Sequence, residues 1–237
     1  MAAMECPICG AGTFHDRGER PHALCGGCHA DERSRILWMM LACHDRLRPG
    51  LRVLHLAPEP SLHPRFRALF GDGYEPADVD PALYPEVAGI RKLDLVTDAS
   101  ALPTGAYDLV LHSHVMEHVP CNVTAVLFHL HRALKPDGMQ VCCVPIVRRR
   151  HYAEDLGPLS REEATERFGQ DDHVRIFGGL GIKRTLGMVF RLPDPYDLRA
   201  WFSEEELRHR AIPEAAWTFW SPHAVLPLAK DDLLLRN

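Results

Sequence analysis

Four cysteines near the start of the chain are the residues whose spacing points most clearly to chemistry. Cys6 and Cys9 form one C-x2-C pair, and Cys25 and Cys28 form a second pair after 15 intervening residues. Two residues between the members of a pair let both thiolates reach one ion, an arrangement typical of four-thiolate zinc sites. Because four cysteines close the coordination sphere, we expect a structural Zn²⁺ that folds this segment and takes no part in catalysis.

Other features of the same segment leave two alternatives open. His15, His22 and His29 could replace a cysteine as ligand, although solvated loop histidines are the simpler interpretation. Zinc ribbons also bind nucleic acid or protein, but residues 1–48 contain six Arg against six Asp and Glu, which indicates no basic face. We therefore expect the segment to act mainly in folding.

Histidines that could act as bases occur at two further places. His112, His114 and His118 surround the end of an apolar run, and the alternation of a strand would put His112 and His114 on one face. His173 lies in a polar loop beside Asp172, which could orient its ring. Imidazole is the commonest general base near neutral pH, so His114 and His173 are the predicted candidate bases.

The elements that must position these residues follow from the hydrophobic pattern. Between residues 51 and 147, short apolar runs alternate with helical stretches, which favours a parallel sheet with crossover helices. The expected strands are 51–56, 76–79, 90–95, 107–113 and 139–147, with helices at 61–70, capped by Ser61, and at 122–134. We therefore predict an α/β fold with a doubly wound, mostly parallel, Rossmann-like sheet whose ligands bind beyond the carboxyl ends of the strands.

Segments on either side of this core complete the predicted organisation. Residues 1–48 form the zinc knuckle and a docking helix that begins after Asp31, and an Arg-Pro-Gly sequence marks the boundary. Residues 49–237 form the Rossmann-like domain. Within it, residues 148–200 are predicted as a lid or substrate insertion that contains a helix at 160–168.

The residues of this core resemble those of a known enzyme family. The run 53–57, Asp80, the pair Asp94-Leu95, the sequence VMEHV at 115–119 and the sequence RALKPDG at 132–138 are similar to class I S-adenosylmethionine-dependent methyltransferases, of the methyltransferase type 11 kind. The resemblance covers residues 51–147. The cysteine pairs in front of it and the sequence FGQDDHVR behind it resemble a bacterial subgroup of these enzymes with an N-terminal zinc-binding segment.

The resemblance implies a set of contacts with S-adenosylmethionine. In this family the loop after the first strand lies against the methionine part, an acidic residue after the second strand binds both ribose hydroxyls, and an Asp after the third strand contacts the adenine amine. A carboxylate suits a diol because it accepts two hydrogen bonds at once. Asp80 is thereby expected at the ribose and Asp94 at the adenine, with Asp98 as the alternative. The residues expected around the cofactor are His55, Ala57, Glu59, Asp80, Asp94, Leu95, Asp98 and His114.

The first-strand loop departs from the family's glycine-rich pattern, D/E-x-G-x-G-x-G, because residues 55–61 read HLAPEPS. Ala57 is small enough for close approach of the cofactor, whereas Pro58 and Pro60 remove two N–H donors. Glu59 is available to pair with the cofactor's ammonium group. The alternative is an altered, inactive site. The missing glycines also argue against a nicotinamide cofactor, since a pyrophosphate needs them.

Charge and composition narrow the partners. The 237 residues contain 27 Lys and Arg against 32 Asp and Glu, a net charge of −5, which lacks the basic excess of a protein that binds nucleic acid. No stretch reaches the ~18 apolar residues of a membrane span, and the first residues show no secretory-signal pattern. We therefore expect a cytoplasmic protein with no membrane partner, and the oligomeric state stays open.

Together these observations predict a methyltransferase that acts on an oxygen or nitrogen atom of a small metabolite or glycan unit. Methyl transfer is a displacement at an activated sulfonium carbon, so the protein chiefly has to align the nucleophile with the methyl group. Two alternatives stand beside it. One is a non-catalytic, cofactor-binding scaffold or sensor, and the other is an RNA or protein methyltransferase that docks its substrate through the zinc ribbon.

Overall fold

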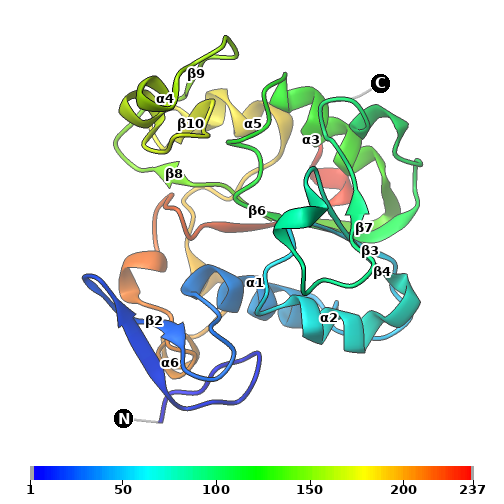
Figure 1. Ribbon diagram of the computed structural model, residues 1–237. Helices are drawn as coiled ribbons and strands as arrows, with labels where there is room; N and C mark the ends of the chain where they lie inside the picture. Colours follow the sequence, from blue (N-terminus) through cyan, green and yellow to red (C-terminus); the bar gives the residue numbers. More distant parts are fainter. Residues whose placement is uncertain (1–2, 236–237) are drawn as a thin grey trace.

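In the computed structural model, which describes residues 3–235, a six-stranded sheet forms the centre of the protein (Figure 1). The strand order is β11-β7-β6-β3-β4-β5, and every neighbouring pair is parallel except β11 and β7. The strands span Val53–Leu56 (β3), Tyr74–Asp78 (β4), Arg91–Lys92 (β5), Tyr107–Ser113 (β6), Leu134–Cys143 (β7) and Val225–Ala229 (β11). From β3, successive strands are added first toward β5 and then, from β6 on, toward the opposite edge of the sheet. This change of side confirms the doubly wound topology and creates a crevice beyond β3 and β6.

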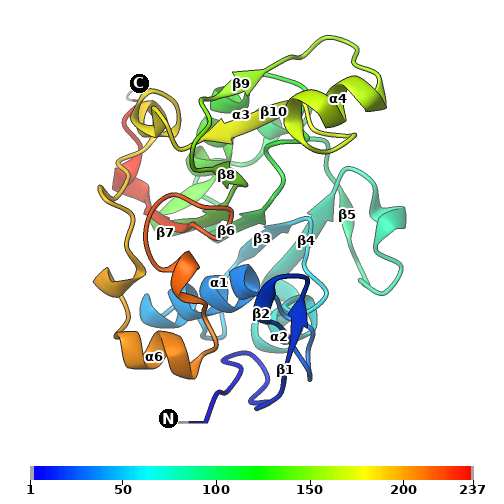
Figure 2. The same cartoon turned by 90° about the vertical axis from the view of Figure 1, so that its left-hand side faces the viewer.

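Helices cover both faces of this sheet. Helices α1 and α2 lie on one face, where Trp38 stacks on Phe66 with ring centroids 5.7 Å apart, and α3 lies on the other (Figures 1 and 2). The helices span Glu32–Cys43 (α1), His63–Phe70 (α2), Val123–Arg132 (α3), Arg161–Phe168 (α4), Leu186–Val189 (α5) and Glu204–His209 (α6). None of the helices within residues 3–235 has both the length and the apolar character needed to cross a membrane.

The start of α2 differs from the prediction. Ser61 does not cap this helix, because the N-cap is Leu62 and no side chain bonds to the first turn. The carbonyl oxygen of Glu59 instead accepts hydrogen bonds from the N–H groups of Leu62 and His63, at 3.0 and 2.9 Å. A backbone turn therefore satisfies the donors that a serine was expected to satisfy.

The third parallel strand is much shorter than the predicted run 90–95. Strand β5 pairs with β4 only at Arg91 and Lys92, at the edge of the sheet. The chain then turns, because the carbonyl oxygen of Asp94 accepts from the N–H of Asp98 at 2.7 Å and the Asp98 carboxylate accepts from the N–H of Asp94 at 3.0 Å. These local bonds compete with the sheet ladder and end the strand.

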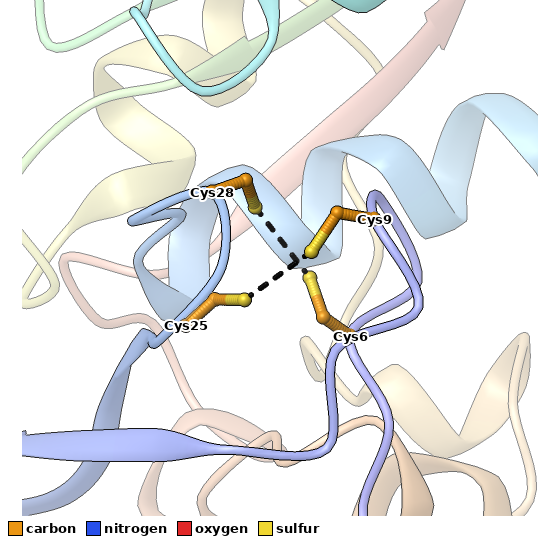
Figure 3. A group of neighbouring side chains, drawn as sticks. All are labelled: Cys6, Cys9, Cys25 and Cys28. Atoms are coloured by element: carbon orange, nitrogen blue, oxygen red, sulfur yellow. Dashed lines mark hydrogen bonds between the residues drawn. The ribbon is translucent and has the colours of Figure 1, made fainter.

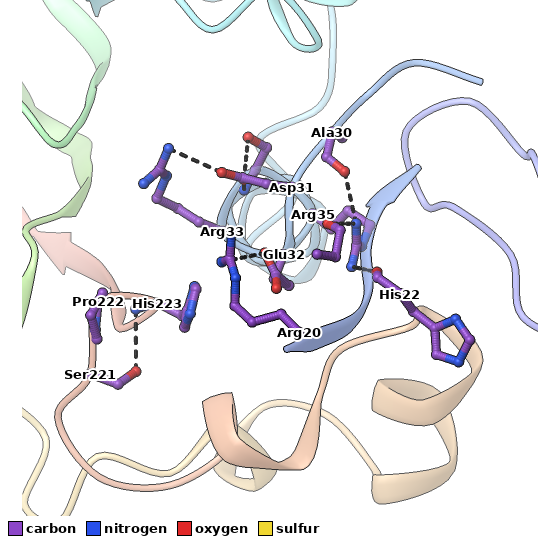
Figure 4. Close-up of polar contacts among 12 residues, drawn as sticks. Arg20, His22, Ala30, Asp31, Glu32, Arg33, Arg35, Ser221, Pro222 and His223 are labelled. Carbon is purple, nitrogen blue, oxygen red and sulfur yellow. Dashed lines mark hydrogen bonds and ion pairs between the residues drawn. The ribbon is translucent and has the colours of Figure 1, made fainter. Parts of the chain in front are cut away.

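A buried arginine is one of the contacts that fasten the N-terminal segment to the rest of the protein. Strands β1 (Phe14–Arg17) and β2 (Arg20–Cys25) form a hairpin beside α1. Arg35 of α1 is fully buried and donates hydrogen bonds to the carbonyl oxygens of His22, Ala23, Ala30 and Ala211 at 2.8–3.0 Å. Figure 4 shows the contacts with His22 and Ala30. The Arg35 guanidinium thereby joins the hairpin, the turn before α1 and the region after α6.

Replacing Arg35 by Met should lower the free energy of unfolding by about 3–5 kcal/mol, because buried carbonyl groups would lose their only charged donor. Chemical denaturation of the purified chain measures this difference. Arg17→Met is the matched control, since Arg17 is exposed on the same hairpin, and it should change stability by less than about 0.5 kcal/mol. Equal effects of the two substitutions would contradict an anchoring role for Arg35.

A second, smaller sheet lies over the carboxyl ends of the central strands (Figure 2). It consists of β8 (Ile146–Val147), β9 (Ala153–Glu154) and β10 (Arg175–Gly178), in the order β8-β10-β9. Arg175 is fully buried and donates to the carbonyl oxygens of Met116 and Cys121, and its Nε donates to Glu154 at 2.8 Å. This arginine therefore holds the small sheet against the loop that follows β6.

Candidate functional site

A cavity of about 370 Å³ opens at the carboxyl ends of β3, β4 and β6, where the doubly wound topology predicts a ligand site. Its volume lies within the range of small-molecule sites, ~300–1,000 Å³. The lining residues are Leu56, Ala57, Ala77, Asp78, Val79, Leu83, Tyr84, Leu93, Asp94, Leu95, Val96, His114, Val115, His118, Val119, Pro120 and Asp172.

The cavity wall includes half of the residues expected around a cofactor. Four of the expected residues line it, namely Ala57, Asp94, Leu95 and His114. The other four, His55, Glu59, Asp80 and Asp98, are not part of the wall. The predicted residues therefore come from the strand ends that surround the cavity, and the residues at each end differ in whether they line it.

The loop after β3 is held by a buried polar chain of contacts. His55 Nδ1 lies 2.8 Å from the Tyr74 hydroxyl, and His55 Nε2 lies 2.6 Å from Glu59 Oε2. The His55 ring is fully buried, and the Glu59 side chain is 12% exposed. Glu59 Oε1 is also buried and has no hydrogen-bond partner within the described residues. Glu59 is thus tied to the loop through one oxygen, and its other oxygen is available to a donor.

Ala57 takes the backbone conformation for which glycine is usually chosen. Its φ is 47°, and its N–H donates to the carbonyl oxygen of Ala77 at 2.9 Å. We expect Ala57→Val to lower the free energy of unfolding by about 1–2 kcal/mol relative to Ala57→Gly, because a β-branched side chain is strained at positive φ. Thermal and denaturant unfolding of the two variants measure this difference. A Val variant as stable as the Gly variant would contradict the strained geometry.

The carboxylate that faces the cavity from β4 belongs to Asp78. Its Oδ2 accepts from the Tyr84 hydroxyl at 3.2 Å, and its Oδ1 accepts from the N–H of Asp80 at 2.8 Å. Asp80 is exposed, and its side chain accepts from the N–H of Ala82 at 3.1 Å, which starts a short 3-10 turn. The sequence did not single out Asp78, because the predicted strand 76–79 placed it inside the strand, whereas β4 ends at Asp78.

Asp94 and Asp98 occupy different positions after β5. Asp94 lines the cavity, and its Oδ1 accepts from the N–H of Val96 at 2.9 Å. Asp98 lies outside the wall and accepts from the N–H of Asp94 and the hydroxyl of Thr97. These two hydrogen bonds, the backbone one first, hold the pKa of Asp98 below its ordinary value. The structure therefore gives Asp98 a local role in the turn that presents Asp94.

The two histidines at the end of β6 do not share one surface. His112 is fully buried inside the sheet, where its Nε2 lies 2.9 Å from Gln140 Nε2, and burial lowers its pKa to about 3. His114 follows the strand with a φ of 54° and lines the cavity. Strand alternation does not relate the two, because β6 ends at Ser113. Only His114 can contact a molecule in the cavity.

Both ring nitrogens of His114 are engaged. The Arg33 guanidinium of α1 donates to His114 Nδ1 at 3.0 Å, and His114 Nε2–H donates to the carbonyl oxygen of Pro222 at 3.1 Å. Burial and the neighbouring Arg33 lower the pKa of His114 to about 4, so the ring is neutral near pH 7. Arg33 carried no signal in the sequence, because 81 residues separate it from His114.

His173, the second predicted base, lies in a cluster with Glu117 and His118. Its ring is 6% exposed and packs edge to face on His118, with centroids 4.6 Å apart. Burial, followed by the neighbouring His118, lowers the pKa of His173. Glu117 is fully buried, and burial raises its pKa to about 8. Of this cluster, only His118 belongs to the cavity wall.

The four N-terminal cysteines converge on one point (Figure 3). The sulfur atoms of Cys6 and Cys28 are 3.7 Å apart, those of Cys9 and Cys25 are 3.5 Å apart, and all four lie within 4.8 Å of one another. A tetrahedral Zn²⁺ with bonds of about 2.3 Å separates its sulfur ligands by about 3.8 Å. The sulfur positions therefore fit such an ion.

The electrostatics of one cysteine suit a thiolate ligand. Burial opposes ionisation of Cys25, but hydrogen bonds from the N–H groups of Cys28 and Gly27, with the neighbouring sulfur atoms, outweigh it and lower the pKa of Cys25 to about 7. The Gly27 N–H lies 3.3 Å from the Cys25 sulfur. Gly27 also has little space for a side chain, since a Cβ there would lie 3.1 Å from the Cys9 sulfur.

A family model described as "Methyltransferase domain" matches residues 42–211, a stretch that begins after the cysteine pairs. Among solved structures, the trans-methyltransferase CalH in complex with SAH is similar, with 22% identity over 47% of this chain and 37% of that chain and a TM-score of 0.36. An S-adenosylmethionine-dependent methyltransferase from Mesorhizobium loti shares 22% identity over 54% of this chain and 62% of that chain, with a TM-score of 0.42.

The YcgJ protein from Bacillus subtilis matches over a longer stretch, with 16% identity over 75% of this chain and 78% of that chain and a TM-score of 0.42. The matches to CalH and to the Mesorhizobium loti protein span less than two thirds of those chains. No curated protein matches the sequence significantly.

Proposed function

Because the chain belongs to the methyltransferase domain family, we propose that it transfers a methyl group from S-adenosylmethionine to an oxygen or nitrogen atom of a small metabolite or glycan unit. The observation that carries the proposal is the cavity at the carboxyl ends of β3, β4 and β6, whose wall includes Asp78 and Asp94. Ligands of doubly wound sheets bind at this place.

The cavity residues suggest one arrangement of the cofactor. Asp78 accepts the ribose hydroxyls, in place of the expected Asp80, and Asp94 accepts from the adenine amine. Ala57 and His114, which line the cavity, would adjoin the methionine part. The expected pairing of Glu59 with the ammonium group is not part of this arrangement, because Glu59 lies outside the cavity wall and its free oxygen is buried. The acceptor atom then bonds to the methyl carbon, and the carbon–sulfur bond electrons return to sulfur, which leaves S-adenosylhomocysteine.

The proton of the acceptor is the remaining requirement, and His114 and His173 stay the candidate bases. His114 lines the cavity but would first have to give up the Arg33 hydrogen bond at Nδ1. His173 is buried behind His118. A nitrogen acceptor that is already deprotonated needs neither base, because the sulfonium carbon is activated in advance.

The four cysteines are proposed to bind a structural Zn²⁺, on the evidence of their sulfur spacing. In this organisation, residues 1–48 are a zinc knuckle with a docking helix, residues 49–237 are the methyltransferase domain, and residues 148–200 act as a lid over the cofactor. The contacts of Arg175 with the loop after β6 support the lid assignment, since they hold the small sheet beside the cavity.

A non-catalytic, cofactor-binding protein is the second candidate, and the loop after β3 favours it. Glu59 and His55 already pair with each other, and Pro58 offers no N–H to the methionine part. Such a protein would bind the cofactor and transfer nothing. The difference between the two candidates therefore lies in turnover and not in binding.

Calorimetric titration with S-adenosylmethionine and S-adenosylhomocysteine tests the proposal first. We expect binding of both at micromolar concentrations, followed in an acceptor screen by formation of S-adenosylhomocysteine. Binding without turnover on any acceptor would favour the scaffold or sensor. The absence of binding to either compound by the folded protein would contradict both candidates.

A further inference from the structure

The carboxylate of Glu117 is buried without a hydrogen-bond partner. The residue is fully buried, and within the described residues neither Oε1 nor Oε2 accepts a hydrogen bond. The closest ring nitrogens are His114 Nδ1 at 3.7 Å and His118 Nε2 at 3.9 Å, both beyond hydrogen-bond distance. A buried carboxyl group without hydrogen-bond partners is costly in either protonation state, so a partner is missing at this place.

The nearby arginines do not supply that partner. Arg33 donates to His114 and forms an ion pair with Asp31 at 3.0 Å. Arg175 directs its guanidinium to Glu154 and to main-chain carbonyl oxygens. Both guanidinium groups thus bond to other acceptors. Arg33 Nε has no partner among the described residues, and neither arginine hydrogen-bonds to the Glu117 oxygens.

Two imidazoles complete a set of ligands around Glu117. One ligand atom each from Glu117, His118 and His173 can be chosen so that all three lie within 4.8 Å of one another. A tetrahedral ion with bonds of about 2.1 Å separates its ligand atoms by about 3.4 Å, so the 3.9 Å between Glu117 Oε1 and His118 Nε2 needs only a small closure. Two imidazoles and one carboxylate are a common ligand set for divalent transition metals.

The surroundings of His118 match those of a metal-bound histidine. Asp172 Oδ2 lies 3.2 Å from His118 Nδ1, so Nδ1–H donates to the carboxylate and the lone pair of Nε2 stays on the side of Glu117. His118 and Asp172 also line the cavity, which offers a path for an ion from solvent. The His118 ring is therefore oriented to bind an ion, and the ion can reach it through the cavity.

We propose that Glu117, His118 and His173 bind one divalent transition-metal ion. The ion compensates the buried carboxylate and ties the loop after β6 to the segment before β10. The site is separate from the four cysteines, and it rests on these side chains and not on the proposed methyl transfer. An experiment can therefore refute metal binding without refuting methyl transfer, and it can refute methyl transfer without refuting metal binding. A metal-bound His173 cannot also accept a proton with the same lone pair, so His114 is the candidate base in the metal-bound protein.

Titration with Co²⁺, without S-adenosylmethionine, tests the proposal on the full chain. One equivalent of Zn²⁺ is added first, because thiolates take zinc in preference and fill the cysteine site. We expect one Co²⁺ per chain, with visible ligand-field absorption and no thiolate-to-cobalt charge-transfer band. No binding by the folded chain, or absorption of the thiolate kind alone, would overturn the proposal.

Variants locate the ion. Glu117→Gln and His173→Asn should each weaken Co²⁺ binding by at least about tenfold, and Asp172→Asn, at an exposed residue outside the core, by about tenfold. Asp171→Asn is the matched control, since this neighbouring carboxylate pairs with Arg161 and should leave the affinity unchanged. Circular dichroism confirms folding of each variant. Undiminished binding in folded Glu117→Gln, His173→Asn or Asp172→Asn would refute the assignment.

Discussion

Asp78→Asn should weaken the binding of S-adenosylmethionine by about tenfold or more. The carboxylate of Asp78 faces the cavity and can accept both ribose hydroxyls, whereas an amide offers one acceptor and one donor group. A hydrogen bond to a charged group contributes about 1.5–3 kcal/mol, which corresponds to a factor of roughly 10–150 in affinity. Calorimetric titration with S-adenosylmethionine or S-adenosylhomocysteine measures the change.

Asp80→Asn is the matched control, because it makes the same substitution two residues along the chain. Asp80 is exposed and lies outside the cavity wall, and its side chain accepts from the Ala82 N–H, so its replacement should change cofactor affinity by less than about twofold. Asp78→Asn also changes the contact with the Tyr84 hydroxyl, so thermal unfolding of both variants checks that a weaker affinity does not come from a less stable fold. A larger loss of affinity in Asp80→Asn than in Asp78→Asn would assign ribose binding to Asp80, as expected from the sequence alone.

Cys25→Ser should release zinc and destabilise the whole protein. Binding of a structural Zn²⁺ is coupled to folding and supplies about 10–16 kcal/mol in isolated zinc peptides. Loss of even about 3–5 kcal/mol of this stabilisation would lower Tm by roughly 10 °C for a chain of this size. The effect should reach beyond the cysteines, since Arg35 connects the hairpin and the turn before α1 to the carbonyl oxygen of Ala211.

Cys43→Ser provides the control for this substitution. Cys43 is exposed at the end of α1 and lies outside the four-cysteine cluster. Its variant should keep one zinc per chain, measured by elemental analysis, and should unfold at the same temperature as the unmodified protein. A zinc-free Cys25→Ser protein with unchanged Tm would show that the cysteines do not stabilise the fold through a metal.

The hydrophobic pattern was sufficient to predict the architecture. Buried parallel strands are short apolar runs, and Tyr107–Ser113 was predicted with its observed bounds. The predicted helix 122–134 is observed as α3, Val123–Arg132, and the side chain of Asn122, its N-cap, accepts from the N–H groups of Thr124 and Ala125. These signals are local, because periodicity and capping depend on neighbours within a few residues.

The ends of the strands were predicted less well, and the candidate cofactor residues depend on them. Strand β4 ends at Asp78, which lines the cavity, whereas the predicted strand ended at residue 79, and the turn from Asp94 to Asp98 shortens β5. Competition between local side-chain bonds and the sheet ladder decides these positions. The family pattern has glycines after the first strand, and in this chain Ala57 takes the left-handed conformation in that loop.

By itself the sequence determined the doubly wound fold, the cysteine spacing and the strand ends that surround the cavity. Only the tertiary structure decided which side chains meet there. It brings Arg33 of α1 to His114, and His173 to His118 and Glu117, across long stretches of chain. Burial then changes the chemistry of these groups, because a carboxylate or imidazole removed from water depends on the partners that packing provides.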